Sequence, residues 1–364
     1  MCLYPRIIRN PKYKENKKNG GVIPPYTDHR VTKIPIGCSQ CMECRKKKKD
    51  EWTVRLMEDV KQHKNGKFVT FTFSNESYTE LAKNFNVTGY ELDNAIATLA
   101  VRRFTERWRK KYKKTIRHWF VTELGHGQTE HLHLHGIIWA GKDDKSDIKE
   151  IMDEVEKIWS YGWIWKGREY RGKLENYVNE KTATYISKYM LKVDPLHKEY
   201  KSIILTSKGI GKKYVESPKT QNNKYKGEET RDYYISDSNR KMSLPIYYRN
   251  YIYTEEQREA LWINKLDKQK RYVLGVEVDF SSKEGEIEYY IKLNEARKTN
   301  KKYGFGVGHK NWNRLEYEEQ LRGLKQEERG VTKQKIREDR KTKEIFMLNM
   351  NNETRLAYEF INGF

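Results

Sequence analysis

The sequence predicts an α+β fold in which helices flank an antiparallel sheet. Segments 67–73 and 118–124 are rich in β-branched and aromatic residues, and segment 131–140 alternates histidine with leucine, so all three are expected to be strands. Predicted helices intervene, which gives the order strand, helix, strand, strand, helix, helix. We expect the second and third strands to pair as a hairpin.

The elements are predicted in chain order. Residues 1–50 are basic and loop-like, and a helix is expected from near Cys41 to about His63. The capping-box pattern from Thr88 to Glu91 predicts the start of a long helix. The apolar positions of that helix include Leu92, Ile96, Leu99, Phe104 and Trp108. Further helices are expected at about 145–160 and 181–192, with a charged one at 312–345.

Three regions follow from this reading. Residues 1–55 form a basic, Cys-containing segment, residues 56–215 form the domain that holds the candidate site, and residues 216–364 form a polar, partly helical region without an assigned role. No run of about 18 apolar residues is present, which predicts no membrane partner. The absence of a signal-peptide pattern and the clustering of the cysteines favour a reducing cytoplasm.

The charge of the chain favours a polyanionic partner. Lys and Arg number 73 against 51 Asp and Glu, so the formal net charge is +22. Nucleic acid is the usual partner for such an excess, although a solvated basic surface would have the same composition. The 26 tyrosines suit unpaired bases, which stack on aromatic rings while cations hold the phosphates.

The histidine strand predicts a metal site. His131, His133 and His135 alternate with leucines, so their side chains leave one face of a strand, about 6–7 Å from one another. Glu123 lies on the strand before them and pairing would bring its carboxylate close. Two imidazoles with one carboxylate suit Mg²⁺ or Mn²⁺ and leave coordination positions open. The alternative is a polar strand face without metal.

Two tyrosines predict a nucleophilic centre. Tyr185 and Tyr189 lie one helical turn apart, and so do Lys188 and Lys192. A phenol is a weak nucleophile near pH 7, and a neighbouring lysine would favour the phenolate and balance phosphate charge. The alternative is a tyrosine pair that packs on a core with the lysines in solvent.

The four cysteines predict a possible structural metal site. Cys38 and Cys41 have metal-knuckle spacing, and Cys2 and Cys44 would complete a four-thiolate zinc site. The Cys-x-x-Cys-x-x-Cys spacing also occurs in iron–sulfur ligation. Reduced thiols without a metal are the third possibility.

Together these motifs resemble the HUH endonucleases, and within them the replication initiators of Microviridae phages of the gokushovirus kind. The first 250 residues or so carry the resemblance, through Met1–Pro5, Cys38–Arg45, Phe68–Phe73, Glu123–Gly125, His133–Ile138 and the double Tyr-x-x-Lys of 185–192. The chain departs from that family in having His131-Leu132 where Arg-Pro is frequent. This departure makes His131 a competitor of Glu123 for the place of third metal ligand.

The resemblance implies an HUH-type sheet and a rolling-circle initiator that nicks and rejoins single-stranded DNA at a viral origin. One tyrosine would keep the 5′ phosphate while the freed 3′ hydroxyl primes synthesis, and the other would act in termination. Its partners would include a host helicase, polymerase and single-strand-binding protein, in the cytoplasm of a bacterial host. Alternatives are another HUH enzyme (a plasmid initiator, relaxase or transposase) and a non-catalytic nucleic-acid-binding or packaging protein.

Overall fold

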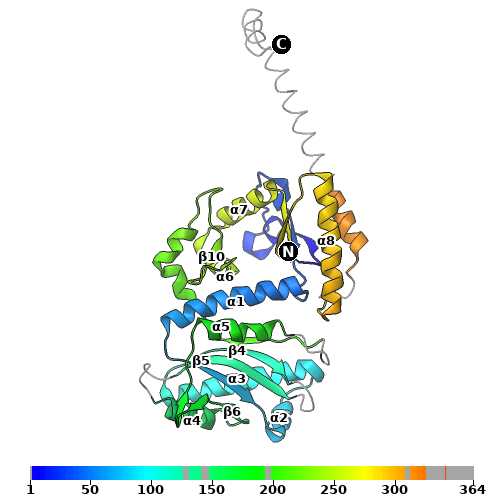
Figure 1. Ribbon diagram of the computed structural model, residues 1–364. Helices are drawn as coiled ribbons and strands as arrows, with labels where there is room; N and C mark the ends of the chain where they lie inside the picture. Colours follow the sequence, from blue (N-terminus) through cyan, green and yellow to red (C-terminus); the bar gives the residue numbers. More distant parts are fainter. Residues whose placement is uncertain are drawn as a thin grey trace, which may run out of the picture. The chain divides into compact units, whose positions relative to one another are not determined.

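The computed structural model describes residues 2–125, 131–140, 147–192, 197, 199–307, 312–324 and 341. Within them the fold is mixed α and β, around a five-stranded antiparallel sheet (Figure 1). The strand order is β6-β3-β5-β4-β9, so the histidine strand β5 is central. Contacts divide the chain into two compact units, Met1–Leu3 with Cys38–Gly308, and Tyr4–Gly37 with His309–Phe364. The predicted boundaries at 55 and 215 stay a prediction.

The sheet contains β3 (Gly66–Thr72), β4 (Arg117–Leu124), β5 (Leu132–Trp139), β6 (Ile164–Trp165) and β9 (Ile204–Thr206). The first unit has three further hairpins, β7 (Arg168–Tyr170) with β8 (Lys173–Glu175), β10 (Tyr233–Ile235) with β11 (Lys241–Ser243), and β12 (Lys270–Val273) with β13 (Val276–Asp279). Its α-helices are α1 (Met42–Gln62), α2 (Asn75–Ala82), α3 (Gly89–Tyr112), α4 (Ile148–Trp159), α5 (Glu180–Ser187), α6 (Ile246–Ile252), α7 (Glu255–Asp267) and α8 (Lys283–Lys302).

The three predicted strands are confirmed as the centre of the sheet. The hairpin of β4 and β5 is present, with Glu123 paired to His133. The edge strands β6 and β9 were not predicted, because two and three residues are too few to carry a periodic pattern. Thr88 is the N-cap of α3 as predicted, but its side chain makes no capping hydrogen bond. The predicted capping box is therefore wrong in its contacts.

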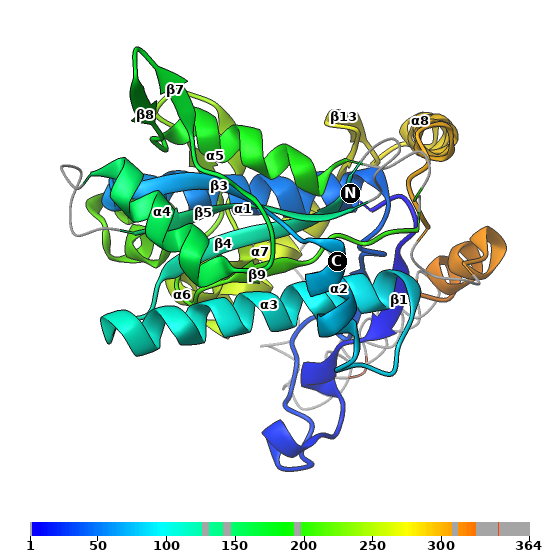
Figure 2. The same ribbon diagram turned by 90° about the horizontal axis from the view of Figure 1, so that it is seen from below.

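One face of the sheet packs against α3 and α4, which lie in front of the strands in Figure 2. Phe71, Phe120 and Leu134 are fully buried there, with Phe104 of α3 and Trp159 of α4 among them. Burial of large side chains on this face supplies much of the hydrophobic stabilisation of the sheet.

The central strand carries a glycine where two neighbours approach closely. A Cβ on Gly136 would overlap Cδ1 of Phe120 and lie 2.5 Å from the carbonyl oxygen of Trp119. No other residue fits there without moving β4 away from β5. Gly136 follows His135 directly, so this close approach also fixes the backbone of the histidine strand.

The other face of the sheet packs against α1 and α5 (Figure 1). Trp119 and Ile137 are fully buried on this side. Asp59 of α1 is also buried, and it accepts a hydrogen bond from Nε of Arg117 on β4 at 2.9 Å. The backbone N–H of Gly211 donates to the same carboxylate at 2.7 Å. These paired polar contacts fix α1 on the strand that precedes the histidines.

The N-terminal region is more ordered than its loop-like composition predicted. In the second unit β1 (Arg6–Arg9) pairs with β2 (Lys33–Ile36), and Nε1 of Trp312 donates to the carbonyl oxygen of Pro5 at 3.0 Å. The predicted charged helix at 312–345 is helical over residues 314–324, and most of its remainder lies outside the described residues. Among the described helices none is both long and apolar enough to cross a membrane.

Candidate functional site

The histidines lie at the centre of the sheet on the face that α1 and α5 cover. His133 and His135 are half-buried, and their ring centroids are 6.3 Å apart with planes 24° from parallel. Leu132 and Leu134 are buried on the opposite face. The predicted common face of the two histidines is therefore confirmed.

Glu123 reaches the histidines from β4. Its backbone pairs with His133, and its Oε2 lies 2.7 Å from Nε2 of His135. The other carboxylate oxygen, Oε1, forms an ion pair with Lys192. The structure thus brings two of the predicted metal ligands into direct contact and sets the third on the same face.

His135 is held from behind by a neighbouring strand. Oγ1 of Thr70 on β3 lies 3.0 Å from Nδ1 of His135, so Nε2 is the nitrogen that faces Glu123. A partner on one imidazole nitrogen orients the other nitrogen, which is the usual second contact of a metal-binding histidine.

His131 lies just before β5 and its carbonyl oxygen accepts from the N–H of Gly125 at 2.8 Å. Its side chain makes no hydrogen bond or ion pair with another described residue. By contact geometry, Glu123 is thus the better placed of the two candidates for third ligand.

The electrostatics keep these groups in their metal-binding protonation states. Burial lowers the pKa of His133, and the neighbouring His135 lowers it further. Burial alone would raise the pKa of Glu123, but hydrogen bonds from His135 and Lys192 outweigh burial and lower it. A neutral imidazole and an ionised carboxylate are the forms that bind a metal ion.

The donor set fits Mg²⁺ or Mn²⁺ by chemistry, because it offers imidazole nitrogen and carboxylate oxygen on one face. It is not a tight ligand cluster. Within the described part of the chain, the cysteines form the only group of three or more possible ligand side chains whose atoms all lie within 4.8 Å of one another. Glu123 is instead engaged with His135 and Lys192, so an ion would compete with the ion pair to Lys192.

The two tyrosines meet the histidine site. Their hydroxyl oxygens lie 3.0 Å apart. The ring of Tyr189 stacks on His135, with centroids 4.1 Å apart and an interplanar angle of 14°. Tyr185 is 51% exposed and touches Phe68 edge-on, with centroids 6.3 Å apart. Two phenols therefore lie beside the candidate metal ligands.

The helix that carries them is shorter than predicted. α5 ends at Ser187, and a 3₁₀ turn covers Lys188–Met190, so the predicted helix to residue 192 is wrong at its end. The predicted pairing of the lysines on one helical face fails as a result. Lys188 is exposed and has no ion pair with another described residue. Lys192 pairs with Glu123, and its Nζ lies 5.7 Å from the ring centroid of Tyr189.

The phenol of Tyr189 is protonated at neutral pH in this arrangement. Burial raises its pKa well above the ordinary value, and the hydrogen bond with Tyr185 and the negative charge of Glu123 raise it further. Attack by this oxygen thus requires a proton acceptor or a nearby cation.

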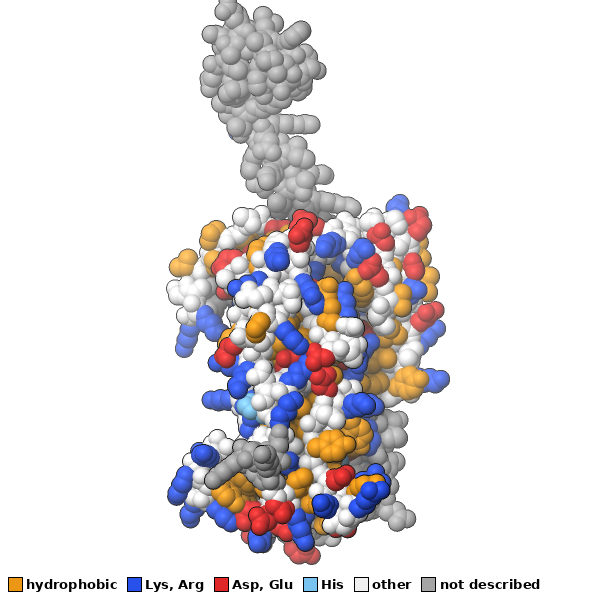
Figure 3. Space-filling view, turned by 60° about the vertical axis from the view of Figure 1, so that its left-hand side comes forward, with side chains coloured by type: hydrophobic (Ala, Val, Ile, Leu, Met, Phe, Trp, Pro, Cys, Tyr) orange, Lys and Arg blue, Asp and Glu red, His pale blue; other side chains and the backbone are white. Residues whose placement is uncertain are grey.

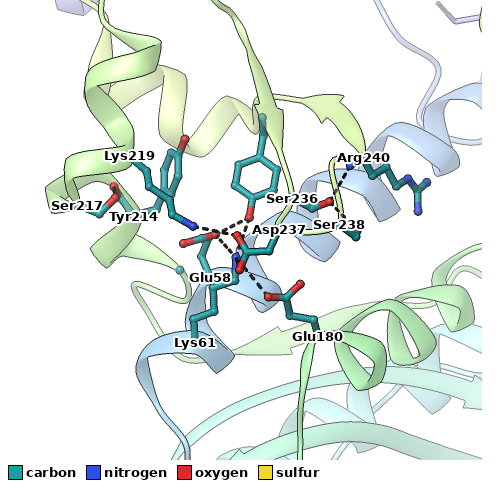
Figure 4. Close-up of polar contacts among 12 residues, drawn as sticks. Glu58, Lys61, Glu180, Tyr214, Ser217, Lys219, Ser236, Asp237, Ser238 and Arg240 are labelled. Atoms are coloured by element: carbon teal, nitrogen blue, oxygen red, sulfur yellow. Dashed lines mark hydrogen bonds and ion pairs between the residues drawn. The ribbon is translucent and has the colours of Figure 1, made fainter.

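Both ends of α5 are anchored to α1. At its start, Nζ of Lys61 lies 3.3 Å from Oε1 of Glu180 and 3.0 Å from carboxylate oxygens of Glu58 and Asp237 (Figure 4). Burial alone would lower the pKa of Lys61, but these carboxylates outweigh burial and raise it. At its end, Oγ1 of Thr53 donates to Oγ of Ser187 at 2.8 Å. The tyrosines therefore extend from a fixed helix.

The cysteines converge, as predicted. Sγ of Cys2 lies 3.9 Å from Sγ of Cys41, and Sγ of Cys38 lies 4.0 Å from Sγ of Cys44. All four thiols are free of disulfides. The cluster lies at the start of α1, at the opposite end of that helix from Lys61.

The surface fits a polyanionic ligand. Figure 3 shows Lys and Arg side chains spread over the face that it presents, with hydrophobic side chains among them. Exposed aromatic residues near the site include Trp163, Tyr170, Tyr177 and Tyr185. This mixture suits stacking of bases next to phosphate contacts.

Sequence reasoning did not identify two contributors to the site. Thr70 orients His135, and Thr53 holds Ser187 at the end of α5. The only available signal was a polar residue at every second position of the first strand, at 70 and 72.

Comparison with known proteins agrees with this site. A family model for replication-associated proteins of the ORF2 type matches residues 66–194. The matched region runs from β3 to just beyond the 3₁₀ turn, so it contains every candidate residue of the histidine and tyrosine site. No curated protein and no solved structure matches the chain. The chain is thus similar to replication-associated proteins over the part that holds the site, which indicates a role in DNA replication.

Proposed function

We propose that the chain is the rolling-circle replication initiator of a single-stranded DNA phage. It nicks the origin strand with a tyrosine, stays attached to the 5′ phosphate and later rejoins the strand. The observation that carries this proposal is the stack of Tyr189 on His135, with the hydroxyl of Tyr185 3.0 Å from that of Tyr189. The family match adds support for replication, and the HUH-type motifs add the chemistry.

His133, His135 and Glu123 would hold one Mg²⁺ or Mn²⁺ ion, with Thr70 fixing the orientation of His135. When bound, the ion supplies Lewis-acid polarisation of the scissile phosphate. The ring of Tyr189 covers His135 and limits the approach of water from that side. Lys192 supplies positive charge at the same place and steadies the phosphate.

The chemical step needs only the chain and the DNA. The phenolic oxygen of one tyrosine attacks phosphorus as the bond from phosphorus to the 3′ oxygen breaks. The phenol's proton passes to solvent or to a nearby base, and the leaving 3′ oxygen takes up a proton. One phosphodiester bond replaces another, so no nucleotide cofactor is consumed and the reaction can run in reverse.

The pair of tyrosines suits a complete replication cycle. While one phenol holds the 5′ end, the other can cut the regenerated origin. The 3′ hydroxyl that this cut releases attacks the first phosphotyrosine and closes a circle. The single-stranded origin would be the substrate, host helicase, polymerase and single-strand-binding protein would be partners, and the bacterial cytoplasm would be the location.

A single assay tests the proposal against a purely binding protein. The full chain is incubated with end-labelled single-stranded viral DNA and Mn²⁺, then denatured and separated by size. We expect a protein–DNA adduct that resists denaturation and disappears with EDTA. DNA binding without any adduct would contradict nuclease activity and favour a packaging protein. A relaxase or transposase would form the adduct but would not release closed circles from origin-bearing strands.

A further inference from the structure

The cysteine cluster has the geometry of a closed metal site. For a zinc–sulfur distance of about 2.3 Å, two thiolates on a tetrahedron lie about 3.8 Å apart. The two measured sulfur separations are 3.9 Å and 4.0 Å, and all four Sγ atoms lie within 4.8 Å of one another. The sulfurs are too far apart for disulfides, which require about 2 Å.

The surrounding backbone is arranged for thiolates. The N–H of Cys38 points to Sγ of Cys2 at 3.2 Å, and the N–H of Cys41 points to Sγ of Cys38 at 3.2 Å. The N–H of Leu3 donates to Sγ of Cys41 at 3.5 Å. Such donors stabilise negative sulfur.

The local charges favour the same state. Cys41 is the N-cap of α1 and Cys44 lies in its first turn, where the helix dipole favours negative charge. Four thiolates around one divalent ion carry two net negative charges. Arg45 and the four lysines at 46–49 follow the last cysteine directly and can balance them.

We propose that Cys2, Cys38, Cys41 and Cys44 bind one Zn²⁺ ion in a closed, structural four-thiolate site. Zinc prefers tetrahedral sulfur, and four protein ligands leave no open position for chemistry. An iron–sulfur cluster would separate the four sulfurs further, because several irons and sulfides would lie between them. The site is distinct from the histidine site, which offers nitrogen and oxygen.

The ion would fasten three segments that are distant in the sequence. It would join residues 2–3 to the start of α1, where the N–H of Met42 donates to Oδ1 of Asn300 at 2.8 Å. From the same helix α8, Nε of Arg297 donates to the carbonyl oxygen of Leu3 at 3.0 Å. Because α1 also packs on α5, the zinc would hold the helix against which the tyrosines are positioned.

Metal analysis of the purified full chain tests this site directly. We expect one zinc per chain by elemental analysis, released in full when a mercurial reagent titrates the four thiols. Cobalt in place of zinc should give the intense absorption of tetrahedral thiolate coordination. These measurements use the unaltered chain, so misfolding of a variant cannot obscure them. Zinc well below one per chain, or iron with visible absorption, would overturn the proposal.

Variants separate this site from the histidine site. Cys38→Ser or Cys41→Ser should lose the zinc, because a closed site fails when one thiolate is removed. His133→Ala with His135→Ala should keep one zinc per chain while nicking is lost. Loss of zinc from the histidine double variant, with retention in both cysteine variants, would show that the cysteines are not the ligands.

Discussion

The ring of Tyr189 lies parallel to the imidazole of His135, with centroids 4.1 Å apart. This contact joins the two motifs that carry the proposed function, since one residue is a candidate nucleophile and the other a candidate metal ligand. Between them in the sequence lie α4, three short strands and α5. The proximity is therefore a property of the fold and cannot follow from local sequence.

Loss of either histidine should abolish nicking. In His133→Ala or His135→Ala the scissile phosphate would lose its Lewis acid, and EDTA should mimic either change. DNA binding should survive, because Lys and Arg supply it. Nicking by the double variant in the presence of EDTA, measured on labelled single strands, would refute the metal assignment.

The third ligand is tested by comparing Glu123→Ala with His131→Ala. We expect the first to lose nicking, because Glu123 contacts His135 at 2.7 Å. His131→Ala should nick at nearly the wild-type rate. The reverse result in the same assay would give His131 the place of third ligand.

The two lysines should differ in their effect on metal binding. Lys192→Met frees the carboxylate of Glu123 from its ion pair and should tighten Mn²⁺ binding by a few-fold, since a partly exposed pair contributes about 1 kcal/mol or less. The same change should slow nicking, because a cation beside the phosphate is lost.

Lys188→Met is the matched control for the metal titration. Lys188 is exposed, so Mn²⁺ affinity should stay at the wild-type value. Calorimetry without DNA measures both affinities. Equal affinities for the two variants would mean that the Lys192 pair does not compete with the ion.

Metal affinity should persist to mildly acidic pH. Protons compete with the ion for a histidine, and burial lowers the pKa of His133 below 6.5, so protonation starts at a lower pH than for a free imidazole. The lowered pKa of Glu123 keeps its carboxylate ionised over the same range. Mn²⁺ affinity measured from pH 8 to 5 should fall only below about pH 6.5. A midpoint above pH 7 would contradict this reading.

Gly136→Ala should destabilise the sheet. The added Cβ would overlap the ring of Phe120 and the carbonyl of Trp119, and such overpacking costs about 1–3 kcal/mol. Chemical denaturation measures the loss. Gly323→Ala is the control, because no atom lies within 4 Å of its added Cβ. Equal stability of the two variants would show that β4 and β5 can separate at little cost.

The sequence predicted the centre of the sheet because period-two patterns report strand faces directly. His133 and His135 share a face as their spacing requires, and Glu123 meets them because a hairpin pairs its strand with theirs. Local patterns could not predict Thr70, whose role depends on the pairing of β3 with β5. They also failed at Lys192, because the change from α-helix to 3₁₀ turn after Ser187 has no marker such as glycine or proline.

Mapping of trapped DNA adducts tests the central claim most directly. The wild-type chain and the variants Tyr185→Phe, Tyr189→Phe and both together are reacted with single-stranded origin DNA and Mn²⁺, then digested and mapped. We expect adducts only on Tyr185 and Tyr189, nicking but no closed circles from each single variant, and no adduct from the double variant. Adduct on another tyrosine, or normal circle release by a single variant, would contradict the paired-nucleophile account.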